Sequence, residues 1–338
     1  IHPLLSHFFR FWLWLTTSMR TADWVAIHRK HHAKVETEHD PHSPAFFGIN
    51  KVLLQGADLY HMEKNNKETI EKYSQNCPTD WVEEKIYTGR NNLGIFILFI
   101  LNIILFGTVG IIIWSIQMMW TPIFAAGGIN GAGHYWGYRN YNTNDDSTNM
   151  SPIGIIIGGE ELHNNHHAYP TAAKFSLRPW EFDIGWMYIK VFGFLGLCKV
   201  KRLAPRPRII QNKQNTDSKL ITQSILQSKL AVITDFTQKV LKPIYKKENF
   251  NLSFKLLADH PNRLSENQES KVKDLLAKNI KLSTVYSLKN KLHELLHSRE
   301  IKHDNFIQIL NKWSEEARSH GIEALDDFLV RLRSYKVT

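Results

Sequence analysis

Histidines are concentrated at three places along this chain of 338 residues. Two clusters have the form HxxHH, at 28–32 and 163–167, and a lone histidine, His134, follows the apolar stretch that lies between them. Residues three and four apart share a helix face, so each cluster can direct three imidazoles to one spot. Imidazole binds iron, zinc and copper. The pattern predicts a two-metal site whose ligands are His28, His31, His32, His134, His163, His166 and His167.

The donor set suggests one kind of chemistry. Neutral imidazoles bind metal ions without cancelling their charge, so two iron ions held this way stay electron-poor, which suits oxygen activation and attack on a C–H bond. Helix bundles with carboxylate-bridged di-iron sites do related chemistry, but carboxylates are sparse near these clusters. The isolated His2, His7, His42 and His61 are expected to be hydrogen-bonded structural residues. Burying the six clustered imidazoles without a binding partner would cost free energy, which favours metal binding. The alternative interpretation of the two clusters is a solvated basic patch.

The elements that must position these histidines include a membrane-length apolar stretch. No charged residue occurs between Leu93 and Gly133, and a span needs about 20 apolar residues. Gly107 and Gly110 offer a turn, although one long tilted helix is the alternative. If both clusters serve the same metals, they lie on one side of the membrane, which requires an even number of crossings. We therefore expect two spans within about 93–132, with His134 just past the second.

The rest of the first 204 residues is expected to be helical, with one buried or interfacial helix over residues 8–26. A basic run follows the aromatic-rich segment near residue 190, at Lys199, Lys201, Arg202, Arg206 and Arg208. Positive residues favour the cytoplasmic side, so the metal site is expected there. The predicted fold class is an all-α, multi-pass integral membrane protein with a histidine-ligated dimetal domain and a C-terminal helical extension.

Composition limits the remaining possibilities. The net charge of +10 fits an anionic membrane surface, and no zinc finger, aromatic RNA-binding signature or basic zipper indicates a nucleic-acid partner. Two cysteines, Cys77 and Cys198, exclude a disulfide framework. Residues 1–204 are expected to form the membrane domain, 205–217 a linker and 218–338 a soluble helical accessory region without histidine clusters.

These motifs resemble those of membrane fatty acid desaturases of the stearoyl Δ9 type, over about residues 2–203. The segment 28–32 resembles the family's HRxHH box, and 159–167 resembles its GExxHNxHH box. Asn130 and His134 resemble an NxxxH pair at the end of the last span, and the DPH of residues 40–42 resembles the triplet after the second box. The C-terminal helices resemble, more loosely, an extension of bacterial members.

The resemblance implies a bacterial inner-membrane enzyme that uses two Fe ions and O2 to place a cis double bond, Δ9, in a saturated C16 or C18 acyl chain. The substrate would be a fatty acyl-CoA or an acyl-lipid lying in a kinked tunnel under the irons. Asn130 would reach a metal through water, and Glu160 and Asp40 would orient imidazole N–H groups. No HPGG motif or ferredoxin cysteines occur. A separate electron donor is therefore expected: a ferredoxin, a cytochrome b5-like protein or a rubredoxin-like protein.

One family motif is missing. The family's first box, HRxxxHR, would fall ahead of Ile1, and His2 and His7 do not replace it because the following arginine is absent and the distance to His28 is too short. We expect an N-terminally truncated chain that binds metal incompletely and lacks turnover. The alternatives are a related membrane di-iron hydroxylase, a non-enzymatic metal-binding membrane protein with structural zinc, and a protein whose C-terminal helices are an interaction module.

Overall fold

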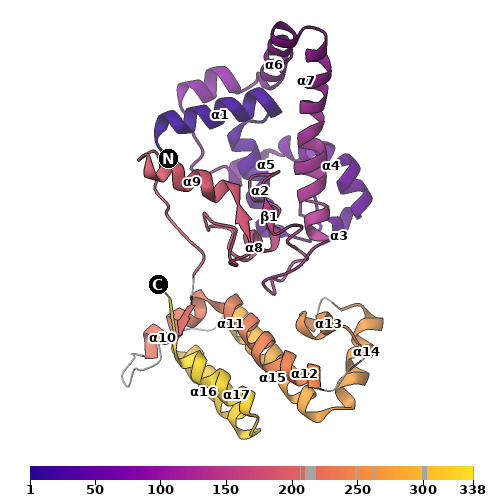
Figure 1. Cartoon of the computed structure of the whole chain (residues 1–338), viewed down its shortest axis with the longest axis vertical. Helices are drawn as coiled ribbons and strands as arrows, with labels where there is room; N and C mark the ends of the chain where they lie inside the picture. The colour runs from indigo at the N-terminus through magenta and orange to yellow at the C-terminus, as the bar shows by residue number, and fades with distance from the viewer. Residues whose placement is uncertain are drawn as a thin grey trace. The chain divides into compact units, whose positions relative to one another are not determined.

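The computed structural model describes residues 1–205, 207–209, 218–247, 250, 252–261, 264–298 and 303–337. The chain divides into two compact units, residues 1–139 with 145–204, and residues 140–144 with 205–338. Both units are built mainly from helices, as Figure 1 shows, so the expectation of a helical fold is confirmed.

Short strands are the exception to the all-α prediction. In the first unit β1 (Ile153–Gly154) pairs in parallel with β2 (Phe182–Asp183). In the second, β3 (Pro207–Ile209) pairs antiparallel with β4 (Tyr335–Val337). The strand β3 falls inside the predicted linker 205–217, and the assignment of this segment as a linker stays a prediction. Residues 206 and 210–217 lie outside the described residues.

The first unit begins with two helices where the sequence suggested one. Ser18 separates them with a left-handed backbone (φ 62°), and its N–H donates to the carbonyl of Trp14. A left-handed residue at this place ends a helix, so a continuous helix over residues 8–26 is wrong. The helices of this unit are α1 (Pro3–Thr17), α2 (Thr21–Lys34), α3 (Pro44–Phe47), α4 (Ile49–Lys64), α5 (Lys67–Tyr73), α6 (Asn91–Phe106), α7 (Val109–Trp120), α8 (His163–Ala168) and α9 (Ile184–Phe194), with π-helical η1 (Glu83–Tyr87) and η2 (Thr121–Ile129) and the 3₁₀ turn η3 (Ala132–His134).

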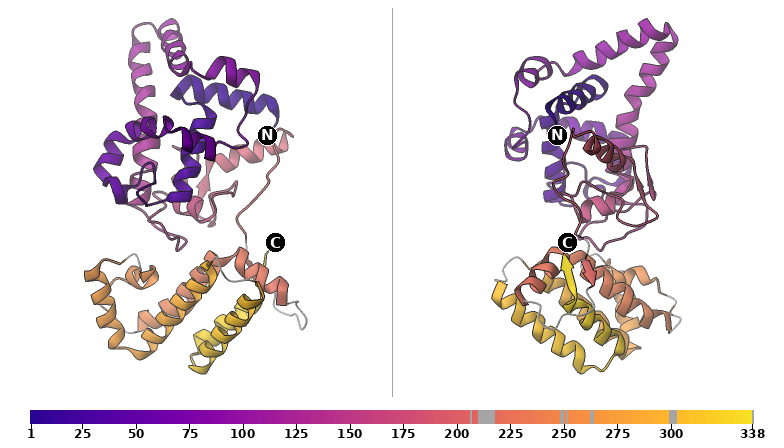
Figure 2. Two further views of the ribbon diagram at one scale, coloured as in Figure 1. Left: turned by 180° about the vertical axis from the view of Figure 1, so that it is seen from behind. Right: turned by 60° about the vertical axis from the view of Figure 1, so that its left-hand side comes forward.

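The apolar stretch folds into α6 and α7, which continues as η2. The turn between α6 and α7 is at Gly107, whose φ is 59°. A Cβ on Gly110 would lie 2.1 Å from the carbonyl oxygen of Asn102, so only glycine permits this close approach. The two views of Figure 2 show α6 and α7 joined by this turn at one end of each helix.

Among the described residues one helix is long and apolar enough to cross a membrane, Val109–His134, with 26 residues. The helix α6 has 16 residues, and 16 residues extend about 24 Å, less than the ~30 Å of a typical hydrocarbon core. The prediction of two spans therefore stays a prediction.

Glycines also bring the end of this long helix against α4. A Cβ on Gly127 would lie 2.6 Å from the carbonyl oxygen of Leu53, and one on Gly56 would lie 3.0 Å from the backbone of Ala126. Small residues allow two helix backbones to approach closely. This contact fixes the helix end that carries Asn130 and His134.

The second unit has a separate hydrophobic core, in which Phe236, Leu288, Trp313, Leu325 and Phe328 are buried. Its helices are α10 (Ser218–Gln227), α11 (Lys229–Phe236), α12 (Lys242–Lys247), α13 (Phe254–Ala258), α14 (Glu266–Ala277), α15 (Ile280–His297), α16 (His303–Ser319) and α17 (Glu323–Arg333), with π-helical η4 (Thr237–Leu241) between α11 and α12. From residue 205 onward the chain carries 24 of its 42 Lys and Arg but only 15 of its 32 Asp and Glu, so nearly all the positive net charge belongs to this part.

Candidate metal centre

The structure brings the seven clustered histidines together in two groups. His28, His32 and His166 form a three-histidine group, in which the Nε2 atoms lie 2.8–3.2 Å apart. A second, four-histidine group consists of His31, His134, His163 and His167. Its Nε2 atoms lie 3.2 Å apart for His31 and His167 and 3.1 Å apart for His163 and His134.

The expectation that each HxxHH cluster gathers its imidazoles at one spot is wrong. On α2, His28 and His32 belong to the three-histidine group and His31 to the other. On α8 the division is reversed, with His163 and His167 in the four-histidine group and His166 in the three-histidine group. Residues four apart on a helix lie one above the other. Each helix therefore gives an i, i+4 pair to one group and the remaining histidine to the other.

The nitrogen spacing fits metal ions. An ion about 2.0–2.1 Å from each imidazole nitrogen places neighbouring nitrogens roughly 3.0–3.4 Å apart. The measured separations of 2.8–3.2 Å are close to that range. Without an ion, so many Nε2 lone pairs facing one another would be poorly satisfied, because each neutral imidazole has a single N–H to share.

Burial keeps these imidazoles neutral. Desolvation lowers the pKa of His28 to about 4 and also lowers the pKa values of His31, His163, His166 and His167. A neutral imidazole is the form that binds a metal. At neutral pH the lone pairs needed for metal binding are therefore available.

Carboxylates lie against the four-histidine group. Its Nδ1 atoms face Asp40 for His31 (2.9 Å), Asp145 for His167 (3.2 Å), Glu36 for His134 (3.3 Å) and Glu160 for His163 (3.4 Å). A carboxylate beside Nδ1 holds the proton there and directs the Nε2 lone pair to the metal position. The pair of His163 and Glu160 is within ion-pair distance only. Nδ1 of His163, like the buried Nδ1 of His166 in the three-histidine group, has no hydrogen-bond partner among the described residues.

The sequence indicated Asp40 and Glu160 but missed Glu36 and Asp145. Glu36 lies just after α2 with a left-handed backbone (φ 60°), and its carboxylate also accepts from the backbone N–H of Asp146. Both are in polar loops where nothing in the local sequence marks a contact with a distant histidine. Only the fold could reveal them.

His42 was expected to be a structural residue, but it lies beside the four-histidine group. Its ring lies 4.4 Å from that of His31, and its backbone N–H donates to Asp40, the carboxylate that holds His31. His42 is buried, and its Nε2 has no partner in the described part of the chain. It forms a third group of potential ligands with His31 and Asp40. The DPH triplet thus places two side chains beside His31.

The loops on either side of α8 are shaped by buried carboxylates and glycine. Glu181 accepts from the side chain of Asn165 and from the backbone N–H groups of Leu177 and Arg178. A Cβ on Gly159 would lie 2.4 Å from Oδ1 of Asp183, and its φ is 104°. The segment 159–167 therefore contains a glycine that the backbone requires and, at the variable position of the GExxHNxHH motif, Asn165, which anchors α8.

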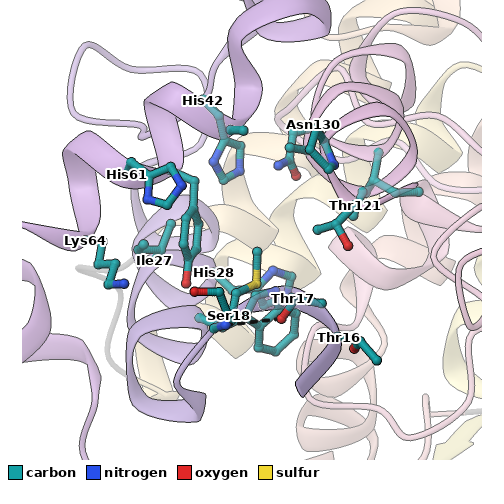
Figure 3. A pocket seen from close by; sticks show the side chains of 18 of the residues that line it. Thr16, Thr17, Ser18, Ile27, His28, His42, His61, Lys64, Thr121 and Asn130 are labelled. Atoms are coloured by element: carbon teal, nitrogen blue, oxygen red, sulfur yellow. Dashed lines mark hydrogen bonds between the residues drawn. The ribbon is translucent and has the colours of Figure 1, made fainter. Parts of the chain in front are cut away.

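A cavity of ≈ 300 Å³ lies beside the three-histidine group. Its wall includes His28, His42, Asn130 and Glu160 at the metal end, and Figure 3 shows His28, His42 and Asn130 among the side chains lining it. Most of the lining surface is apolar, with contributions from Ile27, Ala57, Ile95, Met118 and Ala125. Ligand pockets are commonly apolar cavities of about 300–1,000 Å³ with a few polar groups.

Two segments of the chain match models of known protein families. Residues 1–188 match the family model for fatty acid desaturases, and residues 218–338 match a model described as transposase. The second match covers less than half of the chain, and the described part of that segment consists of helices and the short strand β4. No solved structure matches.

Among curated proteins, a sn-1 stearoyl-lipid 9-desaturase of Synechocystis sp. is 35% identical over 187 residues, which are 54% of this chain and 56% of the relative. A protein of the same name from Anabaena variabilis is 30% identical, covering 54% of this chain and 66% of the relative. The Delta-9 acyl-lipid desaturase 2 of Arabidopsis thaliana is 29% identical, covering 55% and 61%. The chain thus spans 56–66% of the length of these relatives.

Proposed function

The chain belongs to the fatty acid desaturase family, and we propose that its two histidine groups hold two iron ions that serve the oxygen-dependent desaturation of a fatty acyl chain. The observation that carries the proposal is the convergence of seven buried or half-buried imidazoles into two groups beside an apolar cavity. The cavity wall includes His28 of the three-histidine group, together with His42 and Glu160, which lie beside His31 and His163 of the four-histidine group.

The proposed ligands follow from the groups. His28, His32 and His166 bind one iron, and His31, His134, His163 and His167 bind the other, while Asn130, on the cavity wall, acts through a water molecule. Bound iron supplies the activation of oxygen. In the overall reaction two hydrogens leave adjacent carbons, and O2, two electrons and two protons complete the formation of two waters.

Side chains of the protein orient the proposed ligands and hold the substrate. Asp40, Glu36 and Asp145 keep the Nδ1 protons of three imidazoles in place and so fix the direction of each Nε2. Glu160 lies 3.4 Å from Nδ1 of His163. The cavity holds the acyl chain and excludes water from the reacting carbons. Its polar end, at His28, Asn130 and Glu160, is where the chain meets the metals.

The names of the relatives favour a particular substrate. Three are named Δ9 desaturases of lipids, and two of these names specify stearoyl-lipid; a further relative is named icosanoyl-CoA 5-desaturase. We propose a saturated C16 or C18 chain, carried by lipid or coenzyme A, and a cis double bond at Δ9. Electrons come from a separate donor, such as a ferredoxin, a cytochrome b5-like protein or a rubredoxin-like protein.

The location is part of the same proposal. The helix Val109–His134 and the exposed apolar side chains of α6 suit a multi-pass protein of a bacterial inner membrane, with the metal site on the cytoplasmic side. The absence of a nucleic-acid partner stays a prediction, which the match of residues 218–338 to transposases does not test.

Fatty acid analysis tests the proposal. The protein is expressed from its complete coding sequence in a host without a desaturase, and double-bond positions are determined by gas chromatography–mass spectrometry. We expect Δ9-unsaturated C16 or C18 chains that disappear in His163→Ala and persist in a control variant of an exposed histidine, His39→Ala. Hydroxylated chains would instead establish the related hydroxylase. An unchanged profile from a zinc-loaded protein would support a non-enzymatic metal protein.

A further inference from the structure

The loop of residues 139–147 is shared between the two units of the chain. Residues 140–144 belong to the second unit, although their neighbours in sequence, Arg139 and Asp145, belong to the first. The loop follows η3, which carries His134, and precedes β1. A short segment from within the metal-binding part of the sequence is therefore folded as part of the other unit.

The end of this loop that belongs to the first unit is bound to the four-histidine group. Oδ2 of Asp145 lies 3.2 Å from Nδ1 of His167. Oδ1 of the same buried carboxylate accepts from the backbone N–H and from the hydroxyl of Ser147. Both oxygens are engaged, so the direction of His167 depends on where the backbone places Asp145.

The other side of the loop is fastened within the second unit by Asn142. Its side-chain amide donates to the carbonyl oxygen of Ala258 over 2.8 Å. That carbonyl also accepts from the buried amine of Lys289, which donates in addition to the carbonyls of Leu257 and Asp259. A carbonyl oxygen has two lone pairs and can accept both bonds. The acceptor of Asn142 is thus held in place from α15, on which Lys289 lies.

The chain between the two attachments is short. Asp145 follows Asn142 by three residues, which reach at most about 11 Å when fully extended. Thr143, between them, is buried. A shift of Asn142 is therefore passed on to Asp145 over few rotatable bonds.

Arg139 supports Asp145 from the side of the first unit. Its guanidinium donates to the carbonyl oxygens of Asp145 over 2.7 Å and of Ser147 over 3.0 Å. Bonds from a charged donor are stronger than neutral ones. Loss of the Asn142 attachment should therefore loosen the placement of Asp145 without releasing it completely.

We propose that Asn142 is a positioning residue for the metal centre: by binding Ala258 it orders the loop that directs Asp145 to His167. The inference rests on the proposed function, in which His167 is an iron ligand. It assigns the second unit a role in supporting the four-histidine group. The three-histidine group should not respond, because none of its members is hydrogen-bonded to this loop in the described part of the chain.

Iron binding by the protein expressed from its complete coding sequence tests the role of Asn142. In Asn142→Ala one of two irons should bind about 10-fold more weakly in competition with a chelator, the lower end of the ~10–100-fold loss typical when a ligand histidine loses its partner. Mössbauer spectra should change only in the environment that Asp40→Asn also perturbs. Asn142→Gln keeps an amide and should recover part of the affinity, while Asn144→Ala, at an exposed asparagine of the same segment, should match the parent.

Hydrogen exchange of the metal-free protein gives a readout that does not depend on iron. The backbone N–H groups of Ser147, Thr148 and Asn149 are hydrogen-bonded within the first unit. They should exchange faster in Asn142→Ala than in the parent and in Asn144→Ala, because their loop opens more readily.

The two measurements separate this inference from the proposed function. A parent protein without iron would contradict the proposed function, and unchanged exchange in Asn142→Ala would overturn the role of Asn142 whether or not iron is bound. Faster exchange with parental iron affinity would also overturn it, because the loop would then move without affecting the metal.

Discussion

Nδ1 of His31 lies 2.9 Å from Oδ1 of Asp40, and both side chains are almost completely buried. The second carboxylate oxygen of Asp40 accepts from the backbone N–H of Glu36, and Oδ1 also accepts from that of His42. This carboxylate is therefore fixed from both sides, and it in turn fixes the imidazole. A histidine on α2 acquires its direction from the loop that follows the helix.

The first prediction concerns this pair. Asp40→Asn keeps the shape but removes the negative charge at Nδ1 of His31, and loss of such a partner typically lowers metal affinity about 10–100-fold. We expect a loss of this size at one of two iron sites, measured by competition with a chelator. Asp58→Asn, at an exposed position, should bind iron like the parent. Equal affinity in both variants would contradict the role of Asp40.

The second prediction follows from the unequal carboxylate support of the two groups. In the four-histidine group three imidazoles, His31, His134 and His167, have a carboxylate hydrogen-bonded to Nδ1, while none of the three-histidine group has one in the described part of the chain. Iron should therefore leave in two phases when a chelator is added, the faster phase from the three-histidine group. Glu36→Gln should accelerate only the slow phase. Release of both irons at one rate would show that the carboxylates do not distinguish the groups.

The third prediction concerns the stability of the metal-free protein. Burial lowers the pKa of His28 to about 4, below the ~6.5 of an unfolded histidine. Between these values the unfolded state binds more protons, so the free energy of unfolding decreases as the pH falls from about 6.5 to about 4. Denaturant titrations at several pH values measure this slope. In His28→Gln the decrease should be smaller, and an identical slope would contradict the assignment.

The fourth prediction compares two adjacent glycines. Gly158 (φ 66°) has open space where a Cβ would be, while a Cβ on Gly159 would lie 2.4 Å from Asp183. Gly158→Ala should cost only the left-handed backbone penalty, about 1–2 kcal/mol. Gly159→Ala should lower the melting temperature more and reduce iron content, because it displaces the loop that positions α8. Equal effects of the two substitutions would argue against this steric requirement.

The fifth prediction tests the cavity. Ala57 lines it, whereas Ala45 on α3 is exposed. Ala57→Phe should fill part of the ≈ 300 Å³ and reduce unsaturated product while iron content stays at the parental value. Ala45→Phe is the matched control and should leave both unchanged. Full activity in Ala57→Phe would place the acyl chain elsewhere.

Local patterns in the sequence were enough to single out the clustered histidines as a group but not to divide them. Spacing shows which residues share a helix face, as for His28 and His32, yet the partition between two sites depends on how α2 and α8 face each other. The turn expected at Gly107 or Gly110 is present at Gly107, because glycine accepts the positive φ found there.

Contacts between distant loops could not be derived in the same way. Glu36 and His134 are 98 residues apart, and neither sequence neighbourhood indicates the other.

The most direct test of the account is Mössbauer spectroscopy, with iron quantification, on protein expressed from the complete coding sequence in ⁵⁷Fe. The account predicts two irons per chain in two different environments of equal intensity. Asp40→Asn should perturb one environment and His166→Ala the other. A single iron, two indistinguishable irons, or zinc in place of iron would contradict the claim that the two histidine groups form a di-iron centre.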